Sequence, residues 1–339
     1  MFKKFKDMKI SSILAFLFFV FPVEAEEPPI VLFDSHEPLE LILETDFREI
    51  LDKVKTLDDR QSGFIKYSQG DQQHLIPVRT EPRGNYRRDP ANCHFPPLSL
   101  KFPEENLNTV FQGCSKLKLV VHCRKSKKDK ALVAKEYLCY RFYNLLTDSS
   151  FRVRPAYITY VDYNTKDTLN RHFTFFIERT RDLRNRLAAK KVESEHFKIN
   201  WLNDYDATKL SLFQLLIGNT DWGVFKEHNV KGMESGDRRL AVPYDFDWSG
   251  FVNAPYARPH PKYPIKDVTQ RHFIGKEADI KTILKVKNEF LEIQDDVNKL
   301  INNDPVLSDK EKRRSRKYIA SFYEILNKDR LLFSYLKVK

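Results

Sequence analysis

The sequence predicts an α+β fold in which a strand-rich first half is followed by a mostly helical second half. Two observations predict it. Between residues 30 and 125, apolar residues alternate with charged ones or form short apolar runs, as in strands. After residue 205, apolar residues recur at three- and four-residue spacing, as in helices. A chain of 339 residues is long enough for one large domain or for two lobes around a cleft.

The elements of the first half follow from these local patterns. Apolar residues at helical spacing between 130 and 146 predict one helix inserted among the strands. A polar turn near residue 165 separates the last two expected strands. We expect strands at 38–44, 98–102, 117–121, 156–162 and 172–178.

The second half is predicted to be mostly helical. A helix is expected at 205–217, with Asp206 as its cap and Gly218 at its end. One strand is expected between this helix and residue 244. From 279 to 336 the pattern predicts helix in two pieces, with a break near 302–308.

The first 25 residues predict an export signal. Four lysines, the last of them Lys9, precede an apolar run from Ile10 to Val23, and small side chains near Ala25 suit a signal peptidase. A membrane anchor is the alternative, but it needs roughly 20 apolar residues and this run is shorter. We therefore expect residues 1–25 to be a cleaved signal peptide and the mature protein to be soluble, either periplasmic or secreted.

The charge balance limits the class of partner. The formal net charge is +11, and basic chains often bind nucleic acid. An exported chain rarely meets nucleic acid, so we expect none as a partner. An anionic small ligand, an acidic protein or peripheral contact with an anionic membrane surface fits better. The densest basic runs, at 124–128 and 310–317, are most simply a solvated loop and a solvated helix face.

The cysteines all lie in the first half of the chain. Export would place them in an oxidising compartment, and their spacing lacks the paired C-x-x-C pattern of a structural zinc site. We expect either core thiols or one to two disulfides, and the sequence does not choose among the pairings. The four are Cys93, Cys114, Cys123 and Cys139, the last within the predicted helix.

The most informative residues are acids and an asparagine in the second half. The string GNTDW at 218–222 contains Asp221 and is followed by Asn229; the string YDFDWSG at 244–250 adds Asp245 and Asp247. In phosphoryl transfer, one carboxylate orients the acceptor hydroxyl, while an amide oxygen and another carboxylate hold a divalent metal against nucleotide phosphates. Three aspartates in one cleft would also repel one another unless a cation neutralised them. The sequence therefore predicts a kinase-like site.

Several strings resemble, in the same order, motifs of the spore coat protein CotH family of atypical protein kinases. PRGNYRR at 82–88 and the strand at 96–102 resemble its R-G-N-x-S segment and lysine-bearing strand. FQGCSKLKL at 111–119 resembles its glycine-lysine-leucine strand, and KEYL at 135–138 its R-E-x-L helix. The segments 219–229 and 245–247 resemble its N-x-D...N and W-D-x-D motifs. The strings RGNYRR and IGNTDW also resemble exported bacterial proteins from which no function is carried over.

This resemblance implies a two-lobed protein-kinase-like fold. Residues 26–178 would form the strand-rich N-terminal lobe with one helix, and residues 179–339 the helical C-terminal lobe that carries the catalytic and metal motifs. It also implies transfer of phosphate from ATP, with Mg²⁺ or Mn²⁺, to a hydroxyl of an unknown protein acceptor. The implied roles are Asp221 as catalytic carboxylate; Asn229 and Asp245 as metal ligands, with Asp247 as a second metal ligand or a structural acid; and Arg83, Gly84, Asn85, Lys118 and Glu136 around the nucleotide phosphates, the last two as a lysine–glutamate pair.

Departures from the family pattern favour a second interpretation. Tyr86 and Arg87 stand where the family has small hydroxyl residues, Tyr244 replaces a tryptophan, and eight residues separate Asp221 from Asn229. The chain also has only 10 glycines, although a loop closing on phosphates usually needs them. The alternative is a catalytically inactive pseudokinase or envelope binding scaffold. A metal-dependent hydrolase using the same acids is a third possibility.

Each motif also has a purely structural interpretation. The GNTD string is typical of a helix C-cap followed by an Asx turn, and RGN is typical of a hairpin turn. Lys118 would be a surface lysine on an edge strand, and His228 a hydrogen-bonded turn residue rather than a metal ligand. The aromatic residues around the acids are expected to pack as core beneath the site: Trp222, Phe246 and Trp248.

Overall fold

The structure is a computed structural model that describes residues 28–336, apart from residue 58 and the segments 104–105, 125–126 and 193–196. The predicted signal peptide therefore lies outside the described residues. Within the described ranges, no helix combines the length and apolar character that a membrane-spanning segment needs.

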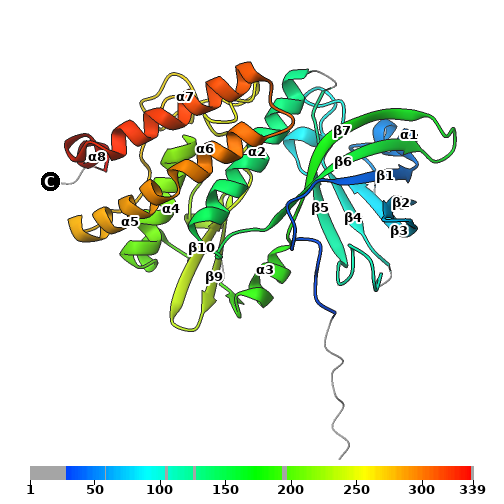
Figure 1. The fold of residues 1–339 in the computed structure, drawn as a ribbon, viewed down its shortest axis with the longest axis horizontal. Helices are drawn as coiled ribbons and strands as arrows, with labels where there is room; N and C mark the ends of the chain where they lie inside the picture. Colours follow the sequence, from blue (N-terminus) through cyan, green and yellow to red (C-terminus); the bar gives the residue numbers. More distant parts are fainter. Residues whose placement is uncertain (1–27, 58, 104–105, 125–126, 193–196, 337–339) are drawn as a thin grey trace, which may run out of the picture.

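The first seven strands form a closed barrel (Figure 1). All neighbouring strands pair antiparallel except the first and the sixth, whose parallel pairing closes the barrel from Leu39 opposite Ala156 to Thr45 opposite Asp162. Closure leaves this sheet without a free edge. Around the barrel the strands are β1 (Leu39–Thr45), β2 (Gln61–Gln69), β3 (Gln72–Pro82), β4 (Leu98–Lys101), β5 (Lys116–Val120), β7 (Thr168–Ile177) and β6 (Val153–Asp162).

Apolar side chains on alternate strand positions fill the barrel. They form one core cluster that includes Leu43, Ile65, Leu100 and Phe176, as expected where every second residue of a strand faces inward. The short helix α1 (Phe47–Asp52) packs on the barrel, because its buried residues Phe47 and Ile50 belong to this cluster. Asp46 caps α1 by accepting a hydrogen bond from the backbone N–H of Glu49 at 2.8 Å.

The five strands expected from the sequence are confirmed as β1, β4, β5, β6 and β7, with ends that shift by up to four residues. The expectation of a single helix in this part is wrong, because α1 precedes the predicted one. The predicted helix is confirmed as α2 (Lys127–Leu146). It lies between the barrel and the later helices (Figure 1), contacting β6 and β7 on one side and α6 on the other.

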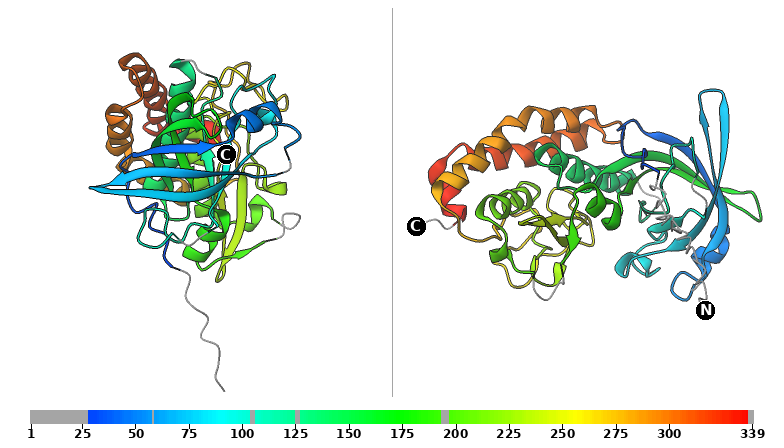
Figure 2. Two further views of the ribbon diagram at one scale, coloured as in Figure 1. Left: turned by 90° about the vertical axis from the view of Figure 1, so that its right-hand side faces the viewer. Right: turned by 90° about the horizontal axis from the view of Figure 1, so that it is seen from below.

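The later part of the chain is mostly helical. Helix α4 (Asp204–Ile217) is almost wholly buried and packs against α5 (Ile280–Glu292) and α7 (Asp309–Leu326). Seen from below in Figure 2, these helices and the barrel lie at opposite ends of the molecule. The remaining helices are α3 (Thr180–Arg186), α6 (Gln294–Asn303), α8 (Asp329–Leu336) and two short 3-10 helices, Ile199–Trp201 and Phe225–Glu227. A small sheet has the order β10 (Arg238–Pro243), β9 (Val230–Ser235), β8 (Lys190–Lys191).

Three expectations for this part need correction. The cap of α4 is Asn203, which accepts a hydrogen bond from the N–H of Asp206; Asp206 itself lies in the first turn. The segment 279–336 contains four helices, because the chain also breaks near Ile293 and between α7 and α8. The one strand expected before residue 244 is a hairpin, β9–β10, with Gly236 at its turn in a left-handed conformation (φ +56°).

The cysteines divide into one disulfide and two buried thiols. Cys93 and Cys123 form the disulfide, whereas Cys114 and Cys139 are free and buried. The disulfide joins the segment that follows β3 to the residues just after β5. Since that segment includes residues 83–88, the disulfide helps to fix the RGNYRR string against the barrel.

Candidate active site

One cavity of about 490 Å³ lies between the barrel, α2 and the loops that follow α4 and β10. It is lined by every residue that the sequence assigned to the site, drawn from segments between residues 83 and 247. Their roles remain predictions, but their convergence is a property of the fold. The nine are Arg83, Gly84, Asn85, Lys118, Glu136, Asp221, Asn229, Asp245 and Asp247.

The RGN segment leaves the end of β3 and runs along the cavity. The backbone N–H of Arg83 donates to the carbonyl of Pro97 at 2.8 Å, which holds the start of the segment beside β4. Gly84 has φ +80°, and a Cβ there would meet nothing within 4 Å, so the conformation rather than the space favours glycine. The segment is therefore a loop ending in a short 3-10 helix, Tyr86–Arg88, and the hairpin-turn interpretation is wrong.

Arg87 lines the cavity together with Glu136, Asp245 and Asp247. Its Nη2 donates to the backbone carbonyl of Val121, and its Nε is buried without a hydrogen-bond partner in the described part of the chain. Burial lowers the pKa of Arg87, but the charges of Tyr256, Asp247, Glu136 and Asp245 outweigh it, and the pKa is raised overall. Arg87 therefore stays charged beside the acids.

Lys118 and Glu136 both line the cavity, but no ion pair joins them among the described residues. Lys118 is half-buried on β5, which lies between β4 and β7, so the edge-strand interpretation is wrong. Burial, then the charge of Arg83, lowers the pKa of Lys118 to about 8. Glu136 comes from α2, is 4% exposed, and has its pKa raised well above the usual range by burial and by Asp247.

Neighbouring residues in the loop after α4 fix the position of Asp221. Gly218 ends α4 in a left-handed conformation, and Asn219 Oδ1 accepts a hydrogen bond from the N–H of Asp221 at 2.9 Å. The C-cap and Asx turn expected from the string are therefore both present. They present Asp221 to the cavity, where His228 Nε2 lies 2.7 Å from Asp221 Oδ1. The structural interpretation of this motif and its place at the cavity are thus compatible.

Asn229 stabilises the same loop through hydrogen bonds to Asp221. Its Nδ2 donates to the carbonyl of Asp221 at 2.8 Å and to Asp221 Oδ2 at 3.0 Å. Both amide hydrogens are used in this way, which leaves Oδ1 to face other groups. Asn229 has φ +50°, a left-handed conformation that asparagine adopts more readily than most residues.

The second acidic loop is tied to the first through the backbone. The N–H of Tyr244 donates to the carbonyl of Asn229 at 3.0 Å, and that of Gly250 donates to Gly218 at 3.0 Å. Asp245 is in a left-handed conformation with φ +63°, and its N–H donates to Tyr140 Oη at 2.9 Å. Such backbone strain is often found at functional sites.

The pKa of Asp247 is raised into the physiological range. Burial, followed by the charge of Asp245, raises the pKa of Asp247 to about 7, against the lowering effect of Arg87. The hydroxyl of Tyr256 donates to Asp247 Oδ2 at 2.7 Å. Glu136, Asp245 and Asp247, named here the acid cluster, therefore repel one another enough to favour the binding of a cation.

The donors fit Mg²⁺ or Mn²⁺ in chemical type. The carboxylate of Asp245 is exposed at the cavity, and Asn229 Oδ1 is an amide oxygen, so both are hard donors. Within the described ranges, no three His, Cys, Asp or Glu side chains lie close enough to hold one ion together. The chain would therefore supply part of a coordination shell, and Mg²⁺ commonly completes its shell with water and phosphate oxygens.

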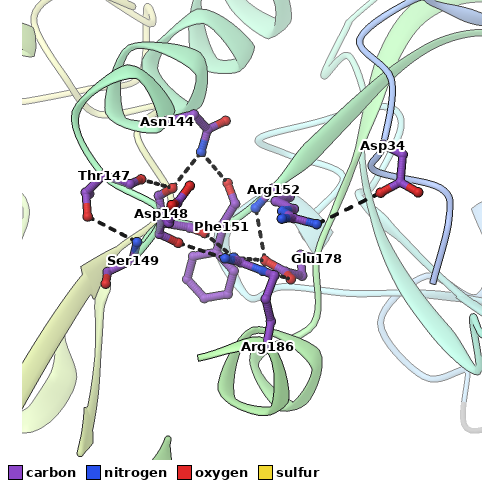
Figure 3. A network of polar contacts seen from close by, with 10 residues as sticks. Asp34, Asn144, Thr147, Asp148, Ser149, Phe151, Arg152, Glu178 and Arg186 are labelled. Atoms are coloured by element: carbon purple, nitrogen blue, oxygen red, sulfur yellow. Dashed lines mark hydrogen bonds and ion pairs between the residues drawn. The ribbon is translucent and has the colours of Figure 1, made fainter. Parts of the chain in front are cut away.

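A polar network holds the strand ends at the apolar end of the cavity (Figure 3). Arg186 on α3 donates to Glu178 through Nε and Nη2, both at 2.9 Å, and to two backbone carbonyls of the loop before β6. The N–H of Arg152 donates to Glu178 at 3.1 Å. The residues beside these partners, Phe151 and Ile177, line the cavity, so the network fixes its apolar wall.

Sequence reasoning missed several cavity residues. Arg87 was treated only as a departure from a motif. Trp248 was expected in the core, but it is half-buried and lines the cavity, whereas Trp222 and Phe246 are buried as expected, 4% and 0% exposed. The Tyr86 ring lies 6.1 Å from Trp248 and 5.5 Å from Tyr256 between centroids. The sequence signal that could have identified Arg87 and Tyr86 was their position in the RGNYRR string.

We found no family model and no curated protein that matches the chain. Among solved structures, it is similar to the crystal structure of the proinflammatory kinase CtkA from Helicobacter pylori. The two are 12% identical with a TM-score of 0.41, and the match covers 76% of this chain and 95% of that one. Similarity at this level carries no argument about activity, so the functional proposal is based on the cavity itself.

Proposed function

We propose that this protein is a kinase-like phosphotransferase that binds ATP with Mg²⁺ or Mn²⁺ and transfers phosphate to a hydroxyl on a protein. One observation carries the proposal. Three separate acidic or amide-bearing segments meet three basic side chains around a single cavity of about 490 Å³, a volume within the range of small-molecule sites. Phosphoryl transfer needs this combination, because catalysis there is mainly positioning and electrostatic stabilisation.

The charges divide the cavity into two sides. Arg83 and Lys118 come from the barrel, whereas Asp245 and Asn229 come from the loops around the small sheet. Bound phosphate would favour the charged form of Lys118, whose pKa is lowered to about 8 by burial and by Arg83. Asp245 and Asn229 Oδ1 would be the residues that hold a divalent ion. Its contribution would be to neutralise phosphate charge.

Asp221 is the group best placed to handle the acceptor proton. Its carboxylate lines the cavity and is held by Asn229 and His228 at 3.0 and 2.7 Å, so its orientation is set before a substrate arrives. A carboxylate that accepts or steers the hydroxyl proton is the expected base in this chemistry. The disulfide Cys93–Cys123 supports the further proposal that the protein works in an oxidising compartment.

Two observations favour a pseudokinase or binding scaffold as the second candidate. The lysine–glutamate ion pair is not formed in the described part of the chain, and the charged Arg87 stands where the resemblance predicts a small hydroxyl residue. Either feature would weaken the grip on phosphates needed for turnover. A scaffold would bind nucleotide with metal but would transfer no phosphate.

The test compares nucleotide binding with phosphate transfer in matched aspartate variants. Binding of a non-hydrolysable ATP analogue with Mg²⁺ is measured by calorimetry, and transfer by labelling of protein acceptors with γ-labelled ATP. We expect Asp245→Ala to remove metal-dependent binding, and Asp221→Ala to keep binding while stopping transfer. Asp237→Ala, in the exposed β9–β10 turn, is the control and should behave like the wild type.

The outcomes separate the candidates. Binding without transfer by the wild type supports the scaffold, and release of phosphate without a labelled acceptor supports a hydrolase. If Asp221→Ala and Asp245→Ala both behave like the wild type in binding and in labelling, the assignment of the site is wrong.

A further inference from the structure

Two neighbouring arginines of the RGNYRR string have different surroundings. The guanidinium of Arg88 donates to backbone carbonyls before β2, those of Val54, Lys55 and Leu57, and Arg88 does not line the cavity. Arg87 lines both the main cavity and a small cavity beside it, and in each it is accompanied by Glu136 and Asp247. Of these two arginines, Arg87 is therefore the one placed to act on the acid cluster.

Arg87 is held in this position from the barrel side. Its Nη2 donates to the carbonyl of Val121, and the disulfide at Cys123, two residues further on, joins the same strand end to the loop that carries Arg87. Cys123 also lines the small cavity. The guanidinium therefore has little freedom to swing out into solvent.

Arg87 lies beside the acids but forms no ion pair with them in the described part of the chain. Among the described residues, no ion pair within 4.0 Å joins it to Glu136 or Asp247, and its Nε is buried without a hydrogen bond. Charges separated by a few ångströms more than contact still interact strongly where little water screens them. A divalent ion at Asp247 would therefore be repelled by a permanent positive charge that it could not displace.

We propose that Arg87 is a resident counter-cation of the acid cluster, so that the cavity takes one divalent ion, at Asp245 and Asn229, and none at Asp247. The inference rests on the metal-dependent binding in the proposed function and refines it. It chooses between the two roles that the resemblance implied for Asp247, a second metal ligand or a structural acid. Asp247 is instead the acid that Arg87 balances and that the Tyr256 hydroxyl holds at 2.7 Å.

The experiment measures Mn²⁺ binding to the full chain, with a non-hydrolysable ATP analogue present, from the signal of free Mn²⁺ in electron paramagnetic resonance. We expect one bound Mn²⁺ in the wild type. Arg87→Gln should gain a second bound Mn²⁺, or bind Mn²⁺ at least about tenfold more tightly, because the repelling charge is gone. Arg87→Lys keeps the charge and Arg88→Gln removes the neighbouring one, so both should match the wild type.

Asp247→Asn is a second variant that does not depend on the folding of Arg87→Gln. If Asp247 holds no metal, this variant keeps one bound Mn²⁺. Two Mn²⁺ ions on the wild type, loss of an ion in Asp247→Asn, or identical binding in the wild type and a folded Arg87→Gln would each overturn the inference and leave the proposed function standing. No Mn²⁺ binding by any of the proteins would overturn both the inference and the metal dependence of the proposed function.

Discussion

A side chain at Gly218, three residues before Asp221, should destabilise the fold for two separable reasons. The φ of Gly218 is +62°, in the left-handed region, and a Cβ built there would overlap Tyr318 Oη and lie 3.2 Å from Tyr318 Cζ. Gly236 in the β9–β10 turn shares only the first feature, since its φ is +56° and nothing lies within 4 Å of a Cβ there. The two glycines are therefore a matched pair.

The magnitudes follow from these two features. A left-handed conformation costs an alanine about 1–2 kcal/mol, and forcing an extra methyl into a packed site costs about 1–3 kcal/mol. We expect Gly236→Ala to lower the free energy of unfolding by about 1–2 kcal/mol. Gly218→Ala should lower it by about 2–5 kcal/mol, because both costs apply.

Tyr318 allows the steric cost to be isolated. Its hydroxyl is buried without a hydrogen bond in the described part of the chain, so Tyr318→Phe alone should change stability by less than about 0.5 kcal/mol. The guanidinium of Arg271 lies 4.0 Å from the centroid of the ring, which limits its movement. The double variant Gly218→Ala/Tyr318→Phe should recover about 1–2 kcal/mol relative to Gly218→Ala.

Urea unfolding followed by far-ultraviolet circular dichroism measures all four variants, and a constant m-value would show that the midpoints report stability. The reasoning is refuted if Gly218→Ala costs no more than Gly236→Ala. It is equally refuted if Tyr318→Phe changes stability by the same amount in the wild type and in Gly218→Ala.

Two further changes test the surroundings of the cavity. Arg186→Ala leaves the buried Glu178 without its charged partner and should lower the free energy of unfolding in urea by about 3–5 kcal/mol. Arg184→Ala on the same helix is the control and should lower it by less than about 0.5 kcal/mol. Equal losses of stability in the two variants would contradict this prediction. For Asp247, the pKa of about 7 against an ordinary value of 3.8 means that the folded chain keeps a proton that the unfolded chain has released between those pH values. Stability therefore falls as pH rises through this window. Asp247→Asn should lack that fall and gain about 2–4 kcal/mol over the wild type between pH 4 and pH 8, and parallel pH profiles would show the shift to be absent.

The elements with a strong local signal were predictable, and those defined by distant pairing were not. Helices α2 and α4 have apolar residues at helical spacing, which the sequence displays directly. Closure of the barrel depends instead on β1 lying parallel to β6, with Leu39 opposite Ala156, and no local pattern encodes which strands meet. The strands β2 and β3 were missed although Ile65 and Tyr67 alternate with more exposed residues, because Gly63, Pro77 and the polar residues at the ends of both strands resemble loop sequence.

The candidate site divides in the same way. Residue types and order identified the acids and the RGN segment, and the cavity brings them together. The ion pair between Lys118 and Glu136 was a guess about side-chain distance, which the sequence does not contain. Arg87 was interpreted as a departure from a motif, because the sequence does not show that its side chain is buried beside Glu136 and Asp247. The functional effect of a residue that departs from a motif depends on the groups that surround it in the fold.

The backbone contact at the end of α4 explains how the two acidic loops keep their separation. The carbonyls of Ile217 and Gly218 accept hydrogen bonds from the N–H groups of Phe251 and Gly250, at 2.9 and 3.0 Å. Arg271 donates to the two preceding carbonyls of α4 at 2.9 and 3.1 Å, so the four carbonyls at this helix end are all satisfied. Because both loops begin or end at this contact, a change there displaces one loop relative to the other. Stability at Gly218 and the geometry of the cavity are for this reason expected to change together.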